Sequence, residues 1–66
     1  MIHYRFYLMV GSMIMSGEHV ACSDDADARA EAVRRLSSAV PTYDAIEVWL
    51  GTRRVYRCDR GGLGAA

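Results

Sequence analysis

The sequence predicts a small α+β domain of the order ββαββ, in which one helix covers one face of a four-stranded, largely antiparallel sheet. Apolar and polar residues alternate over residues 3–10 and again over residues 44–50, as they do in strands with one buried face. Between these runs lies an alanine-rich stretch with apolar residues at helical spacing. The 66 residues allow one domain, expected over residues 1–58, and a flexible C-terminal tail over residues 59–66.

The first hairpin is expected to join a strand over residues 3–10 to a strand over residues 13–22. The connecting turn contains Gly11 at its first position, which suits a type II′ turn because φ is positive there. A two-residue turn then sets the register of the whole hairpin. The expected cross-strand partners are Val10 with Met13, Leu8 with Met15, and Arg5 with Glu18.

The segment Ser23-Asp24-Asp25 predicts the start of a helix, because hydroxyl and carboxylate oxygens accept hydrogen bonds from the first free amides. Pro41 predicts its end, since proline disfavours helical geometry in the residue before it. Opposite charges four residues apart are expected to pair on the solvent side. The expected buried stripe is Ala26, Ala30, Val33, Leu36 and Val40, and the expected ion pairs are Asp25 with Arg29 and Glu31 with Arg35.

The second hairpin is expected to pair residues 44–50 with residues 53–58. Its turn lies at either Leu50-Gly51 or Gly51-Thr52, and both registers keep the same faces because the side-chain period of a strand is two. One set of side chains is expected to face the helix, namely Ile46, Val48, Leu50 and Val55. The other set is expected to face away from it, namely Ala45, Glu47, Trp49, Arg54, Tyr56 and Cys58.

The sheet face away from the helix is predicted to carry a surplus of apolar, aromatic and arginine side chains. Contiguous exposed patches of this kind usually mark interaction sites, and Trp, Tyr, Met and Arg are the residue types enriched in protein interfaces. We therefore expect a non-catalytic protein-binding module that forms a homodimer or binds another protein. The predicted interaction face consists of Arg5, Tyr7, Met9, Ile14, Trp49, Arg54 and Tyr56.

A second hypothesis places single-stranded nucleic acid on the same face, with aromatic rings stacked on bases and arginine near phosphates. The overall charge does not favour it, because eight arginines balance eight acidic residues. The charge is nevertheless uneven, since residues 53–66 hold four arginines and one acid. We expect no enzyme activity, because no motif brings a nucleophile and a base together.

Two cysteines and two histidines supply ligand types that zinc accepts, but their spacing matches no zinc motif. Strand alternation is expected to place His19 on the face opposite His3 and Cys22. We therefore expect no metal and no cofactor. The start of the chain lacks a signal-peptide pattern and no apolar run is long enough to span a membrane, so we expect a cytoplasmic protein with reduced thiols at Cys22 and Cys58.

Three segments, Tyr4-Arg5-Phe6-Tyr7-Leu8, residues 22–28 and residues 46–55, carry a resemblance to known proteins. Together they resemble a group of small, uncharacterised bacterial proteins of about this length, over about residues 4–57. The resemblance implies the ββαββ fold and brings no activity, cofactor or catalytic residue. Turns in that group are more polar, whereas this chain has Val10-Gly11-Ser12 and Leu50-Gly51.

Overall fold

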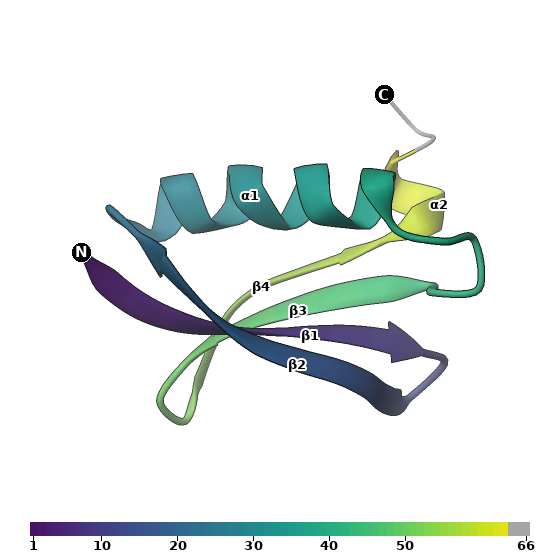
Figure 1. Ribbon diagram of the computed structural model, residues 1–66, viewed down its shortest axis with the longest axis horizontal. Helices are drawn as coiled ribbons and strands as arrows, with labels where there is room; N and C mark the ends of the chain where they lie inside the picture. The colour runs from purple at the N-terminus through teal and green to yellow at the C-terminus, as the bar shows by residue number, and fades with distance from the viewer. Residues whose placement is uncertain (64–66) are drawn as a thin grey trace.

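The computed structural model describes residues 1–63 and shows the expected α+β fold, with one helix lying across one face of a four-stranded sheet (Figure 1). Both hairpins are antiparallel, as predicted. The prediction of a ββαββ domain is thus confirmed. The elements are β1 (Ile2–Val10), β2 (Met13–Cys22), α1 (Asp25–Ser38), β3 (Ala45–Leu50), β4 (Arg53–Asp59) and α2 (Arg60–Leu63).

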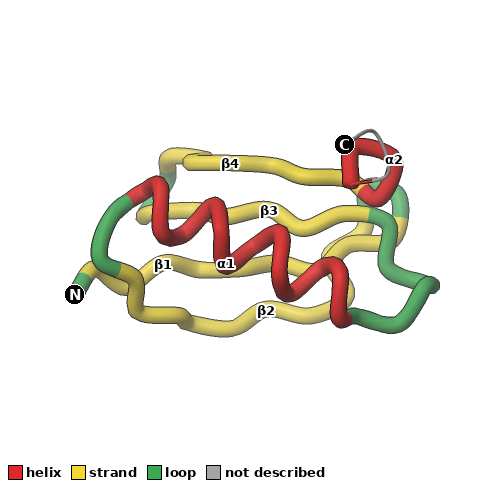
Figure 2. Tube along the Cα trace, turned by 90° about the horizontal axis from the view of Figure 1, so that it is seen from above, coloured by secondary structure: helices red, strands yellow, loops and turns green. Residues whose placement is uncertain are grey.

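The strand order is β2-β1-β3-β4, so the N-terminal strand is central and β2 and β4 form the edges (Figure 2). Because β1 is antiparallel to both of its neighbours, β2 and β3 run in the same direction. Helix α1 connects them by crossing over β1. The two hairpins are joined through β1 and β3, where residues 5–9 pair with residues 45–49.

Both hairpin turns have the predicted two-residue geometry. Gly11 has φ 59° and Gly51 has φ 62°, and within residues 1–63 no other residue type has a positive φ. The second turn position is therefore at negative φ in both hairpins, as a type II′ turn requires. In the second hairpin Leu50 pairs with Arg53, so the turn is Gly51-Thr52.

The first hairpin contains a β-bulge in its edge strand. Met9 pairs with Ile14, but the next pair along β1 is Leu8 with Ser16, so Met15 is an extra residue. Beyond a bulge, each side chain points to the face opposite to the one that it would occupy in an uninterrupted strand. The expected register is therefore wrong beyond the bulge: Leu8 pairs with Ser16 rather than Met15, and Arg5 pairs with His19 rather than Glu18.

The second hairpin has a matching bulge in its own edge strand. Trp49 pairs with Arg54, whereas Val48 pairs with Tyr56, so Val55 is the extra residue. The remainder of β4 is shifted by one residue, which turns its side chains over. The prediction that Tyr56 and Cys58 face away from the helix is therefore wrong, and both pack with the core.

The hydrophobic core lies between α1 and the sheet. Strand β1 contributes Tyr4 and Phe6, which are 1% and 2% exposed. The helix contributes Ala28, Ala32 and Leu36, all fully buried. Alanine at two of these three positions allows the helix to approach the sheet closely, because only a methyl group separates the two backbones. The other buried members of the core are Cys22, Ile46, Val48 and Cys58.

The helix is rotated about its axis relative to the predicted stripe. Ala26, Ala30 and Val40 are exposed, so the predicted stripe is wrong at these positions, while Leu36 is buried and Val33 is half-buried. Alanine occupies every second position over residues 26–32, which leaves two alternative apolar faces. The alternation alone does not select between them.

The predicted start of the helix is confirmed by two reciprocal hydrogen bonds. The Asp24 carboxylate accepts from the amide of Asp27 at 2.8 Å, and the Asp27 carboxylate accepts from the amide of Ser23 at 2.9 Å. Both contacts satisfy donors that would otherwise lack a partner, and both place negative charge at the positive end of the helix dipole.

Only one of the two predicted helical ion pairs forms. Glu31 accepts from Arg35 at 2.8 Å, as expected. The Asp25 carboxylate does not pair with Arg29 but accepts a 2.6 Å hydrogen bond from the hydroxyl of Tyr4. Arg53 lies 3.4 Å from the same carboxylate. Asp25 therefore connects the first turn of the helix to two strands of the sheet.

The chain after residue 58 continues in regular secondary structure. Asp59 ends β4, and the backbone amide of Arg60 donates to the carbonyl of Asp44 at 2.7 Å. The Arg60 guanidinium donates to the carbonyl of Tyr43 at 2.8 Å. Residues 60–63 form α2. The flexible tail over residues 59–66 stays a prediction, and residues 64–66 lie outside the described residues.

The Tyr4–Asp25 hydrogen bond predicts a pH-dependent contribution to stability. It raises the pKa of Tyr4 to about 12 and lowers the pKa of the Asp25 carboxyl. Since the pKa of Asp25 is lower in the folded state, the contribution is present at neutral pH and is lost as the pH falls below the ordinary value of 3.8. Since the pKa of Tyr4 is higher in the folded state, the contribution is also lost as the pH rises from 10 towards about 12.

Tyr4→Phe should therefore lower the midpoint of urea unfolding at neutral pH and have a much smaller effect in strong acid. Tyr43→Phe is the matched control, because the Tyr43 hydroxyl makes no hydrogen bond within residues 1–63. An equal loss of stability at both pH values would show that Tyr4 contributes through packing alone.

Gly51→Ala should destabilise the protein by about 1–2 kcal/mol, because an L-residue is strained at positive φ. A Cβ at this position would have no atom within 4 Å, so the cost comes from the backbone and not from a clash. Thermal unfolding of a synthetic chain with D-alanine at position 51 is the control, since a D-residue favours positive φ. Equal destabilisation by both alanine enantiomers would contradict this explanation.

The open face of the sheet as candidate functional site

The sheet face opposite α1, here called the open face, is the candidate functional site. It is assigned from the strand pairing, because directly paired residues point to the same face. All four strands contribute to it, and both bulges change which residues belong to it. Its residues are His3, Arg5, Tyr7, Met9, Ile14, Gly17, His19, Ala21, Ala45, Glu47, Trp49, Arg54, Arg57 and Asp59.

Six of the seven residues predicted for the interaction face lie on the open face, and Tyr56 does not. Tyr56 is half-buried on the other side, where it packs against the core. Met9 is on the open face but only 7% exposed, so its side chain presents almost no surface. The exposed apolar area in the middle of this face is therefore smaller than the sequence indicates.

Tyr7 covers a glycine on the neighbouring strand. A Cβ on Gly17 would lie 3.1 Å from Cδ1 and Cε1 of the Tyr7 ring, so the absence of a side chain lets the ring rest on the β2 backbone. The guanidinium of Arg5 lies 5.9 Å from the centre of the same ring, within the range of a cation–π contact. Tyr7 is half-buried as a result.

Glu47 is a residue of the open face that the sequence analysis did not select. Its carboxylate accepts from the indole N–H of Trp49 at 2.9 Å and pairs with Arg54 and Arg57 at 3.4 and 3.3 Å. The Glu47 side chain is only 13% exposed. The arrangement fixes the Trp49 ring and neutralises part of the positive charge of β4.

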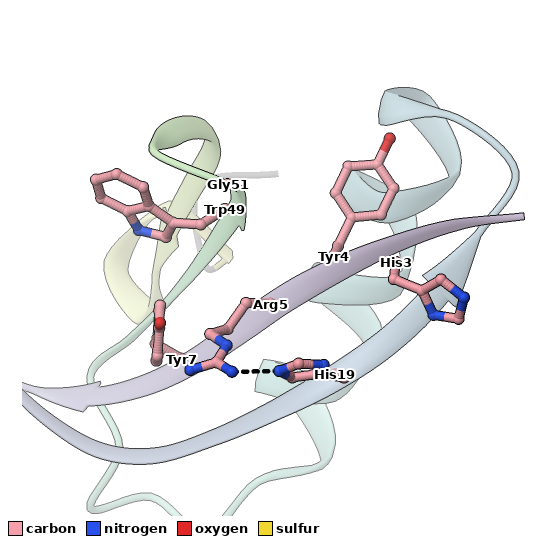
Figure 3. A pocket seen from close by; sticks show the side chains of 7 residues that line it. All are labelled: His3, Tyr4, Arg5, Tyr7, His19, Trp49 and Gly51. Atoms are coloured by element: carbon pink, nitrogen blue, oxygen red, sulfur yellow. Dashed lines mark hydrogen bonds between the residues drawn. The ribbon is translucent and has the colours of Figure 1, made fainter.

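A hollow of about 330 Å³, here called the Arg5 hollow, lies at one end of the open face (Figure 3). Arg5 donates a hydrogen bond to Nε2 of His19. Since arginine has no acceptor, Nε2 of His19 carries no proton in this contact. No acidic side chain lines the hollow, whose residues are His3, Tyr4, Arg5, Tyr7, His19, Trp49 and Gly51.

The structure places the two histidines together and apart from the cysteines. His3 and His19 share the open face, so the prediction that they lie on opposite faces is wrong, and the bulge in β2 is the reason. Cys22 and Cys58 are free thiols buried on the helix side. Burial raises the pKa of the Cys22 thiol. The cysteines lie in the two edge strands, which are three strand spacings or roughly 14 Å apart, and this is too far for a disulfide.

Residues 1–63 contain neither a candidate metal cluster nor a membrane-spanning helix. No group of three or more His, Cys, Asp or Glu side chains in this part of the chain is placed to hold a metal ion. None of its helices has the length and apolar character needed to cross a membrane.

Exposed apolar side chains gather at the turn of the first hairpin rather than in the middle of the open face. Their exposed fractions range from 38% for Val10 to 65% for Met13. Ile14 is the member that belongs to the open face, which makes the cluster continuous with it. This cluster, here called the hairpin tip, consists of Val10, Met13, Ile14 and Met15.

Comparison of the chain with protein-family models, curated proteins and solved structures found no match. The resemblance to small bacterial proteins stays a prediction. The residues of the open face and of the hairpin tip are therefore the features that indicate a function.

Glu47→Ala should destabilise the protein by about 1–3 kcal/mol, because it removes the acceptor of the Trp49 indole N–H and of Arg54 and leaves Arg57 with Asp59 alone. Urea unfolding, followed by the fluorescence of this single tryptophan, measures the effect. Glu18→Ala is the matched control, since Glu18 pairs with Arg35 on the surface and its side chain is 55% exposed. The control should change stability by less than about 1 kcal/mol, and equal effects would contradict a central role for Glu47.

Proposed function

We propose that this protein is a non-catalytic interaction module that forms a homodimer through the hairpin tip and the adjoining part of the open face. The observation that carries the proposal is the exposure of four large apolar side chains around one two-residue turn. Together they form a patch on the order of a few hundred Å², a size at which exposed apolar surface often marks an interaction site.

The hairpin tip is apolar on both sides of the hairpin. Val10 and Met13 are paired on one side, and Ile14 lies on the open face next to the buried Met9. The whole segment over residues 8–17 has no charged side chain, although 24% of the protein is charged. The Asp44 carboxylate accepts from the amide of Gly11 at 2.8 Å and is the charged group next to this turn. Association would remove the exposed apolar side chains of the hairpin tip from contact with water.

A second copy of the chain is the partner that the charge pattern favours. The formal net charge is zero, so two copies do not repel each other at long range. An uncharged apolar tip can pack against an identical tip, as a two-fold interface requires. A 66-residue domain also has a small core, and association is one of the ways in which such domains gain stability.

The contact is proposed to form through side chains and not by pairing of the β2 edges. A regular edge strand offers a row of free backbone groups to another strand, but a bulge interrupts that row and twists the strand. The bulge at Met15 lies within the hairpin tip itself. Continuous pairing of two β2 strands across this point would leave backbone groups unpaired.

Sedimentation equilibrium over roughly 5 to 500 µM protein tests the proposal. The natural chain should form dimers at tens of micromolar, and a variant with Met13→Glu and Ile14→Glu should stay monomeric because dimerisation would bury its charges. Thr52→Glu places one such charge in the exposed turn of the other hairpin and should leave the dimer intact.

Thermal unfolding of the same three proteins shows whether the variants fold, and exposed substitutions should change their stability little. A natural chain that stays monomeric at every concentration would refute the proposal. Equal dissociation by the Thr52→Glu control would also refute it, since the hairpin tip would then have no special role.

A further inference from the structure

The Arg5 hollow is separate from the hairpin tip. Ile14 and His19 pair with Met9 and Arg5, which are four positions apart in β1, and this corresponds to about 13 Å along a strand. The hollow is near the turn of the second hairpin, since Trp49 and Gly51 line it (Figure 3). The two ends of the open face therefore present different chemistry, and each can be changed without altering the other.

Arg5 is a cation without a carboxylate partner within residues 1–61. Its two contacts are the unprotonated Nε2 of His19 and the face of the Tyr7 ring, and neither carries a negative charge. By contrast, Arg54 and Arg57 on the same face both pair with Glu47. Since no acid lines the hollow, its charge is uncompensated and an anionic group would be attracted to it.

Two aromatic rings border this cation. Trp49 is the direct cross-strand partner of Arg5, and Tyr7 follows two residues along β1. Both rings are half-buried, so each keeps some exposed surface. The indole N–H of Trp49 already donates to Glu47, which leaves the face of the ring for stacking. Stacking on such rings is the usual way in which proteins hold a nucleobase without reading its identity.

The hollow has the size of a small-ligand site. Its volume of about 330 Å³ is at the lower end of the roughly 300 to 1,000 Å³ found for ligand pockets. Its lining combines a guanidinium, two imidazoles and aromatic rings, so it offers both charge and stacking surface. Guanidinium groups bind phosphate oxygens in a fixed two-point geometry, and imidazole nitrogens supply further hydrogen bonds.

We propose that the Arg5 hollow binds a nucleotide, either free or as one unit of a single-stranded nucleic acid. Arg5 binds the phosphate, and His3 and His19 hydrogen-bond to the phosphate or the sugar. Trp49 or Tyr7 stacks on the base. In the row that crosses the sheet, His19, Arg5, Trp49 and Arg54 are consecutive partners, so a longer strand could continue from the hollow towards β4.

Titration of the full chain at low salt, roughly 50 mM, with inorganic phosphate, a mononucleotide and single-stranded ten-nucleotide DNA and RNA tests the proposal. Trp49 is the only tryptophan, so its fluorescence reports directly on the hollow. The mononucleotide should quench it, and its indole N–H should shift in NMR spectra. Phosphate alone should bind at least about tenfold more weakly, because it cannot stack.

The oligonucleotides distinguish the two sources of the ligand. Tighter binding of the ten-nucleotide strands, with an affinity that falls steeply as salt increases, supports a single-stranded nucleic acid. Equal affinity for strand and mononucleotide supports a free nucleotide. The absence of any fluorescence or NMR change up to about 10 mM mononucleotide would overturn the proposal, and so would equal affinity for phosphate and nucleotide.

Arg5→Gln should weaken nucleotide binding by at least about tenfold, since it removes the uncompensated charge. Arg34→Gln removes the same charge from the solvent side of α1, where the side chain is 67% exposed, and should change affinity less than about twofold. Arg5→Lys keeps the charge without the planar group and should give an intermediate loss. Equal losses of nucleotide affinity in Arg5→Gln and Arg34→Gln would show that binding depends only on non-specific electrostatic attraction. That result would refute the proposed site.

Binding should be unchanged in the variant with Met13→Glu and Ile14→Glu, because those residues lie at the other end of the sheet. Retained binding in a monomeric variant separates the nucleotide site from the proposed dimer. Loss of binding together with the dimer would show that the hollow is incomplete in one chain and would overturn the assignment to Arg5 alone.

Discussion

One extra residue in each edge strand decides which side chains of this domain reach its core. A single helix can cover only one face of a sheet, so the alternation of a strand assigns each side chain to the core or to the open face. Met15 in β2 and Val55 in β4 interrupt that alternation. Because of these bulges, Tyr56 and Cys58 join the core, and His19 reaches the open face beside Arg5.

Much of the fold follows from local sequence signals, and the errors have local physical causes. The turn glycines, the helix start and the division between Phe6 and Tyr7 depend on neighbouring residues alone. The bulge at Met15 lies in an apolar run followed by serine and glycine, which fits either face equally well. Alternate alanines likewise leave the helix rotation open, until the Tyr4–Asp25 hydrogen bond and packing select one face. The strand order depends on pairing between distant segments, which no local pattern records.

The sequence predicts one continuous apolar face as the candidate site. In the structure this face has two different ends, the apolar hairpin tip and the Arg5 hollow. Most of the predicted residues are on that face, but Met9 is buried, Tyr7 lies over Gly17 and Glu47 holds Trp49 and two arginines. The hairpin tip is the end at which large apolar side chains gather and stay exposed. At the other end, Arg5 and His19 are neighbours because of the bulge at Met15. A sequence pattern that does not reveal the bulge could not predict this pair.

The central position of β1 has a consequence for the synthesis of the chain. One edge of β1 pairs with β2 within the first hairpin. Its other edge pairs with β3, which is made about forty residues later. During synthesis, one edge of β1 therefore has backbone groups without strand partners. The side chains of Tyr4 and Phe6 stay exposed to water until α1 has been made and packs on them. An isolated hairpin is at best marginally stable in water. Until β3 is made, residues 5–9 lack their second set of strand partners, and a chain interrupted before Ala45 would expose an open strand edge of the kind that leads to aggregation.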